Sequence, residues 1–199
     1  MTGLLSDIAH ALALSVDAAL LQRPAYEYVA AHPSIALASL IVPLIAGASE
    51  MLGKAYVLVA QKVGRWRIMA SLAVTGLVYM LGVLVWSASA HFLLSLTGDL
   101  PVSETALAGI IALGYAPRLL SVLTVAPYYG EFLDRALDAW TFVCVGWGFW
   151  VVIGGPIGLV ILCASAGWLV SAGVRHYGGR LTEPLLRRMR LVTPGGGHV

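Results

Sequence analysis

The chain has 199 residues, of which 59% are hydrophobic and only 11% carry a charged side chain. Soluble domains carry about 25% charged residues, so this composition excludes a water-soluble domain and indicates a membrane protein. The net charge of +2 is too small to favour binding to nucleic acid. Because a chain in lipid must satisfy its own backbone hydrogen bonds, the long apolar segments predict an all-α, polytopic transmembrane bundle.

Residues 1–33 are expected to form an N-terminal helix and a linker outside the bundle. Gly3–Gln22 contains the polar residues Asp7, His10 and Asp17, which fall within one broad sector of a helix. This pattern predicts an amphipathic helix at the membrane interface or on partner subunits, with a crossing of the bilayer as the alternative. The tyrosines of the linker suit the headgroup zone.

Five transmembrane spans are expected within residues 34–174. The first, Ser34–Val63, would be about 45 Å long as one helix, which exceeds a hydrocarbon core of about 30 Å. Its second half is therefore expected to protrude or to lie at the membrane boundary. The remaining spans are predicted at Ile68–Leu96, Glu104–Tyr128, Arg135–Ile153 and Pro156–Val174.

A tight hairpin is expected between the fourth and fifth spans. Residues 139–174 contain no Asp, Glu, Lys or Arg, and one straight helix of that length would be about 54 Å long, too long for a single crossing. Gly154, Gly155 and Pro156 interrupt this run, because proline removes a hydrogen-bond donor and glycine weakens a helix. A single kinked helix is the alternative.

The basic residues predict the orientation of the bundle. With five spans, nine of the twelve Lys and Arg residues lie on one face: Lys62, Arg65 and Arg67, then Arg135, and five arginines in the tail over residues 175–199. The positive-inside rule then puts the C-terminus in the cytoplasm and the N-terminus outside. The arginine-rich tail would suit anionic lipids, with a purely topogenic role as the alternative.

Charged residues inside the apolar runs form the candidate functional site. Glu50 and Lys54 are one helical turn apart in the order that favours an ion pair, either at a membrane boundary or in a buried site for an ion or a proton. Arg118 follows Pro117 inside the third span, where a kink would free carbonyl groups. Arg118 could pair with Glu50 or with Asp138, or extend to one membrane surface.

His91, near the outer end of the second span, is a candidate axial ligand for haem or chlorophyll, although a lone histidine is usually only hydrogen-bonded. No cofactor other than haem or chlorophyll is considered, and no metal site is expected. The sequence contains no GxSxG, HExxH, Walker or dinucleotide-binding motif, so enzyme activity is not expected.

Small residues predict close packing of helices, because they let backbones approach one another in lipid. Gly47 and Gly53 on either side of Glu50 would let another helix or a cofactor approach. The further glycines expected at helix contacts are Gly146, Gly148, Gly154, Gly158 and Gly167.

The segment from Ala112 to Val152 resembles Yip1-domain membrane proteins. It carries residues in the order typical of that family: Gly114, Tyr115, Ala116 and Pro117, then Pro127, Gly130 and Trp140. The similarity spans 69–174, and residues 46–63 are similar to the first helix of small cyanobacterial members. The resemblance implies a five-span bundle without enzymatic chemistry and a role in trafficking or membrane organisation. The predicted cytoplasmic C-terminus departs from the topology expected for eukaryotic members.

These features together predict a non-catalytic accessory, assembly or scaffold subunit in a bacterial inner or thylakoid membrane, for example of a photosynthetic or respiratory complex. Its partners would be other integral membrane proteins or a second copy of the chain. The alternative is a small transporter or channel for ions, protons or solutes that uses Glu50, Lys54 and Arg118.

Overall fold

The computed structural model describes residues 2–60, 65–96, 102–125, 129–170 and 173. Most of these residues are helical and none of them forms a strand, which confirms the all-α prediction. The elements in chain order are α1 (Thr2–Ala19), α2 (Arg23–Ala31), α3 (Pro33–Ala38), α4 (Ile41–Ala60), α5 (Arg65–Ser95), α6 (Glu104–Gly114), the 3₁₀-helix η1 (Ala116–Val125) and α7 (Gly130–Ile153). A further helix covers Ile157–Val170.

Four helical segments are long and apolar enough to cross a membrane, which confirms the membrane architecture in outline. They are Pro33–Gly53, Leu72–Ser95, Glu104–Val125 and Gly130–Ile153. The helix over Ile157–Val170 is apolar but shorter in its described part. A fifth span therefore stays a prediction, and the arginine-rich tail lies outside the described residues.

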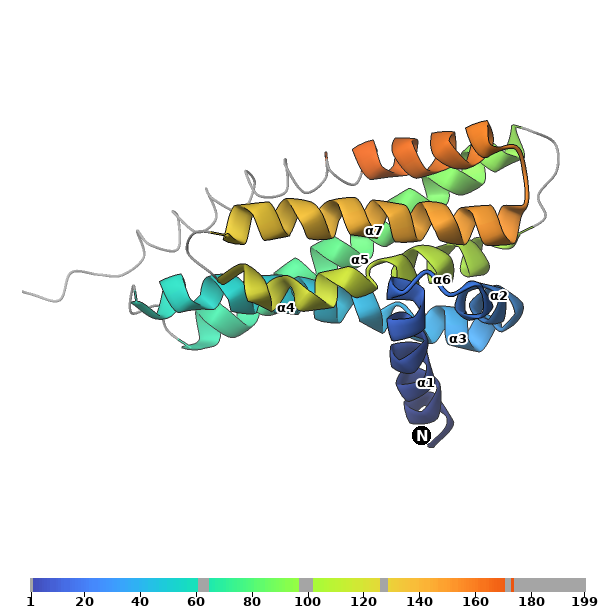
Figure 1. The fold of residues 1–199 in the computed structure, drawn as a ribbon. Helices are drawn as coiled ribbons and strands as arrows, with labels where there is room; N and C mark the ends of the chain where they lie inside the picture. The colour runs from blue at the N-terminus through green and yellow to red at the C-terminus, as the bar shows by residue number, and fades with distance from the viewer. Residues whose placement is uncertain (1, 61–64, 97–101, 126–128, 171–172, 174–199) are drawn as a thin grey trace, which may run out of the picture.

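The hairpin between the last two helices has the predicted form. Gly154 ends α7 in the left-handed conformation, with φ of 62°, and its amide donates to the Trp150 carbonyl over 3.3 Å. Glycine adopts this conformation without steric cost, so it is favoured after a helix. The chain then turns at Pro156, and the following helix runs back beside α7 (Figure 1). A single kinked helix is therefore excluded.

Two predicted spans are each built from two helical pieces. The first is divided between α3 and α4 at Ser39, whose hydroxyl donates to the Ile35 carbonyl over 2.8 Å. Such back-bonding competes with the helical ladder and bends a helix. The third is divided at Tyr115, after which the chain continues as η1, because Pro117 cannot donate to a regular α-helical ladder.

The fourth predicted span begins earlier than expected, at Gly130 rather than at Arg135. Glu131 lies in the first turn of α7, where a negative charge interacts favourably with the helix dipole. Its carboxylate also pairs with Arg135 one turn later. These two interactions stabilise the first turn of α7. A prediction based on apolar residues alone does not include this turn.

The N-terminal helix α1 stands at a steep angle to the long helices (Figure 1). Its C-terminal end is held by two side chains of the bundle: the Tyr26 hydroxyl donates to the Ala18 carbonyl, and the Trp140 indole donates to the Ala19 carbonyl, each over 3.0 Å. These bonds satisfy carbonyls that a helix leaves unpaired at its end. The buried face of α1 consists of small residues: Ala11, Ser15 and Ala18.

The helix α1 does not contact the bundle at one of its ends. Trp140 lies near the middle of α7, so the C-terminal end of α1 meets the bundle at mid-length. The interfacial position expected for Gly3–Gln22 stays a prediction.

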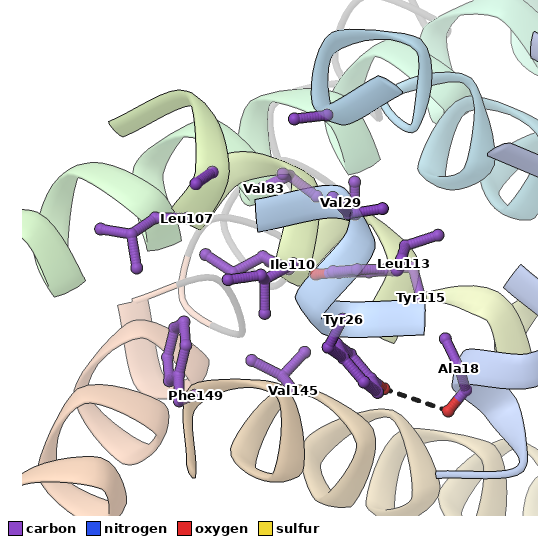
Figure 2. Close-up of a cluster of buried hydrophobic side chains, with 14 of the residues drawn as sticks. Ala18, Tyr26, Val29, Val83, Leu107, Ile110, Leu113, Tyr115, Val145 and Phe149 are labelled. Carbon is purple, nitrogen blue, oxygen red and sulfur yellow. Dashed lines mark hydrogen bonds between the residues drawn. The ribbon is translucent and has the colours of Figure 1, made fainter. Parts of the chain in front are cut away.

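The core lies where α2, α5, α6 and α7 meet (Figure 2). Tyr26 of α2 is fully buried there, and burial raises the pKa of its hydroxyl well above the usual range, so the group stays protonated as a hydrogen-bond donor. The apolar side chains drawn around it come from all four helices: Val29, Val83, Leu107, Ile110, Leu113, Val145 and Phe149.

The structure divides the glycines expected at helix contacts into two groups. A Cβ added at Gly148 would lie 2.6 Å from both Ile110 and Tyr26, and one at Gly167 would overlap the indole of Trp86. At Gly146 and Gly158 an added Cβ would meet no described atom within 4 Å, so these two do not mediate contact between the described helices. Gly154 likewise has open space, and it serves the turn instead.

Alanine at Gly148 should destabilise the bundle, whereas alanine at Gly146 should not. We expect Gly148→Ala to lower the free energy of unfolding by about 1–3 kcal/mol, because its methyl group must displace packed side chains. Gly146→Ala, on the same helix, should be neutral or stabilise by up to about 1 kcal/mol through helix propensity. Thermal unfolding of both variants in one detergent measures this, and equal midpoints would contradict the packing.

Candidate functional site

A buried guanidinium joins three segments of the bundle. Arg118 of η1 has a side chain that is only 2% exposed. Its Nη1 donates to Asp134 Oδ1 over 2.9 Å, and its Nη2 pairs with Asp138, one turn further along α7. Glu50 of α4 is the third carboxylate, with Oε2 3.6 Å from the same Arg118 Nη1. Arg118 therefore links the third predicted span, which is divided at Tyr115, to α4 and α7.

Tyr79 of α5 connects this ion pair network to a fourth segment. Its hydroxyl accepts a hydrogen bond from Arg118 Nη1 over 3.1 Å and donates to Glu50 Oε2. The Arg118 guanidinium carbon also lies 5.9 Å from the centre of the Tyr79 ring, within the range of a cation–π interaction. We call these five residues the Arg118 cluster: Glu50, Tyr79, Arg118, Asp134 and Asp138.

The chain around Arg118 keeps its unusual backbone because α4 supplies hydrogen bonds to it. A 3₁₀-helix rarely exceeds three or four residues, whereas η1 has 10. The Ser49 hydroxyl donates to the Leu119 carbonyl over 2.7 Å and accepts from the Val122 amide over 3.1 Å. Gly53 permits this approach, since a Cβ there would lie 3.1 Å from the Ser121 carbonyl oxygen.

The cluster combines several carboxylates with buried polar atoms. Three carboxylates surround one guanidinium, and their side chains range from 16% exposed at Glu50 to 45% at Asp134. Arg118 Nε and Ser121 Oγ are buried and have no hydrogen-bond partner among the described residues. Lys54 lies in α4 one turn after Glu50, and its side chain is outside the described part of the structure.

The Arg118 cluster lies toward one end of the bundle. Glu50 is near the end of the apolar segment Pro33–Gly53, Tyr79 is in the first half of Leu72–Ser95, and Asp134 and Asp138 are in the first half of α7. These positions are nearer to the end of the bundle with Arg135 than to the hairpin end at Gly154. The outer carboxylates of the cluster are partly exposed on the chain, by 45% at Asp134 and 30% at Asp138.

His91 lies away from this cluster. Its Nε2 faces the Glu104 carboxylate at the start of α6, 3.4 Å from Oε1. Its Nδ1 is buried and has no partner in the described ranges. The role of His91 as a haem or chlorophyll ligand stays a prediction.

Both partners that the sequence offers for Arg118, Glu50 and Asp138, lie beside it. Asp134 and Tyr79 were not among the expected site residues. Asp134 precedes Asp138 by four residues, and this spacing places both carboxylates on one helix face, so the sequence did contain a usable signal. Tyr79 had no such signal, since its position depends on how α5 packs against α4.

That packing is unusually close. A Cβ added at Gly47 of α4 would lie 2.8 Å from the Cα of Gly76 in α5. The two glycines allow backbone contact between the helices, as in other membrane helix pairs. Tyr79, three residues after Gly76, is thereby brought within reach of Glu50.

Comparison with known proteins adds no assignment, because no family model, curated protein or solved structure matches the chain. Within the described residues, no group of three or more His, Cys, Asp or Glu side chains is arranged to hold a metal ion. The Arg118 cluster is therefore interpreted from its own geometry, and the resemblance to Yip1-domain proteins stays a prediction.

Removing the guanidinium should destabilise the bundle strongly. We expect Arg118→Met to lower the free energy of unfolding by about 3–5 kcal/mol, because it leaves carboxylates without their counter-charge. Adding Asp134→Asn and Asp138→Asn should restore part of this loss. Arg135→Met, which removes an exposed arginine paired with Glu131, should cost less than about 1 kcal/mol.

Thermal unfolding of the purified variants in detergent checks this ranking. An Arg118→Met protein as stable as the parent, or one that the two asparagines do not rescue, would show that the ion pairs do not hold the spans together.

Proposed function

We propose that this chain is a non-catalytic integral membrane protein that assembles through α1 with another membrane protein or with a second copy of itself. The observation that carries the proposal is the steep angle at which α1 leaves the bundle at the level of Trp140 (Figure 1). The role corresponds to that of an accessory, assembly or scaffold subunit.

The exposed surface of α1 is better suited to contact with a protein than to contact with lipid. Apolar side chains on it are uncovered, with Leu5 65%, Val16 60% and Leu20 66% exposed. Asp7 is half-buried and His10 is exposed on the same helix. When the long helices cross the bilayer, α1 leaves them sideways at mid-length, and polar groups exposed to lipid there are costly. A partner that covers α1 removes this cost.

The Arg118 cluster has a structural role in this proposal. Its guanidinium pairs with carboxylates of the same chain on α4 and α7, so each carboxylate of the cluster has a cation beside it within the chain. The cluster then keeps the broken span in place, and the assembly surface is provided by α1. The proposed setting is a bacterial inner or thylakoid membrane with the basic C-terminus in the cytoplasm, which the distribution of Lys and Arg supports.

A bulky residue on the exposed face of α1 should disrupt the assembly. We expect the parent chain to be cross-linked in native membranes into one defined species larger than a monomer, and Val16→Trp to lose that species. Val74→Trp is the matched control, because Val74 of α5 is 46% exposed on a long helix and a tryptophan there still faces lipid. The mass of the cross-linked product distinguishes a homodimer from a complex with another protein. A parent chain that stays monomeric would contradict the proposal.

A second candidate function is the binding and transfer of protons or small cations at the Arg118 cluster. It is favoured by the three carboxylates around one guanidinium and by the buried, unpartnered Arg118 Nε and Ser121 Oγ within the described residues. Broken spans and intramembrane charges also accompany ion sites in transporters. In this reading Asp134, the most exposed carboxylate, exchanges with water, and Glu50 is the inner site.

Flux measurements test this second candidate. Liposomes that contain the purified chain and a trapped pH-sensitive dye should show proton or Na⁺ flux, and Glu50→Gln and Asp134→Asn should each abolish it by removing a carboxylate that binds the ion. Glu131→Gln is the control, because Glu131 is 82% exposed and pairs with Arg135 outside the cluster. Flux that is absent from all forms, or equal in all forms, would eliminate the transport function.

A further inference from the structure

An apolar groove lies on the bundle surface between α7 and the helix over Ile157–Val170. Its volume is about 350 Å³, and every residue in its wall is hydrophobic or glycine. Gly146 forms part of its floor, where an added Cβ would meet no described atom within 4 Å. The side chains that define the groove include Phe142, Trp147, Trp150, Ile161 and Ala164.

The groove ends beside an exposed arginine that forms an ion pair with one carboxylate. Trp147 and Trp150 also line a second hollow, whose wall is completed by Val151, Gly154 and Arg23 of α2. Arg23 has a side chain that is 68% exposed, and its Nε donates to Glu27 over 2.7 Å. A guanidinium has five N–H donors, so this one contact leaves further donors to bind an anion.

The groove and the second hollow together extend over about one leaflet of a bilayer. From Phe142 to Gly154 the helix α7 rises about 18 Å, compared with about 15 Å for half of the hydrocarbon core. The end with Arg23 is also the end with the hairpin, where the chain reverses direction. Two tryptophans near this end are typical of the membrane–water interface.

We propose that this groove binds an anionic glycerophospholipid, with one acyl chain between α7 and the Ile157–Val170 helix and the phosphate on Arg23. Lipid tails surround the bundle in any case, so selectivity arises from the fit to the groove and from the charge rather than from the hydrophobic effect. Arginine is suited to this contact because its planar fork pairs with phosphate oxygens. The site is independent of the assembly through α1.

Native mass spectrometry of the full chain in mild detergent tests the site. The chain is titrated with phosphatidylglycerol and, separately, with phosphatidylcholine that carries the same acyl chains. We expect phosphatidylglycerol to bind about fivefold more tightly, the effect of one basic residue near an anionic headgroup. Arg23→Gln should remove this preference, and Gly146→Leu should weaken the binding of both lipids because its side chain fills the groove.

Two matched controls separate the site from general effects. Arg135→Gln removes an exposed arginine of the same i,i+4 pairing type at the opposite end of α7. Gly158→Leu adds a side chain where there is also open space but outside the groove wall. Both should bind phosphatidylglycerol as the parent does.

Three results would overturn the proposal. The first is equal binding of the two lipids by the parent chain. The second is a control variant that loses as much binding as Arg23→Gln or Gly146→Leu. The third is a Gly146→Leu protein that retains its lipid but no longer forms a protein complex, which would assign the groove to a partner helix instead.

Discussion

The ion pairs of the Arg118 guanidinium are the constraint on which the arrangement of the spans depends. A buried charge is tolerated only where opposite charges and hydrogen bonds surround it, and removing one partner leaves the others uncompensated. Here the partners come from different segments: Glu50 from α4, Asp134 and Asp138 from α7, with Tyr79 of α5 between them. A packing that separated these segments would leave the guanidinium or a carboxylate without the partner that it has here. The cluster therefore specifies how the four segments meet, even though apolar residues of the same size could provide as much stability.

The same requirement explains the hydrogen bonds at the interrupted helices. Each helix that ends or changes form inside the bundle leaves backbone groups without partners in its own ladder. Ser49 supplies such partners to η1, while Tyr26 and Trp140 supply them to the last turn of α1. Glycines then permit the approach that these bonds need, as at Gly53 beside η1. The interrupted helices are thus stable because neighbouring elements supply hydrogen bonds to their unpaired backbone groups. The irregular segments and their neighbours therefore depend on one another.

The three features with functional interest are distributed along α7. The Arg118 cluster contacts its first half, α1 meets it at Trp140, and the groove with Arg23 at its mouth lies along its second half. Because these sites share no side chain, each is open to substitution without direct damage to the others. A membrane-embedded charge network, a protruding helix and a lipid groove are compatible in one small bundle, with α7 as the element common to all three.

The sequence by itself determined the membrane setting, the all-helical class, the hairpin at Gly154 and the presence of Arg118 within an apolar span. These depend on local properties: too few charges for a water-facing surface, long apolar runs, and glycine and proline at a turn. It also offered Glu50 and Asp138 as partners of Arg118, because an intramembrane arginine needs a carboxylate and few were present. Only the tertiary structure decided that both contact it at once, that Tyr79 joins them, that Gly148 packs while Gly146 stays open, and that α1 leaves the bundle at mid-length. The physical reason is that these outcomes depend on contacts between helices far apart in the chain, which no local pattern of residues encodes.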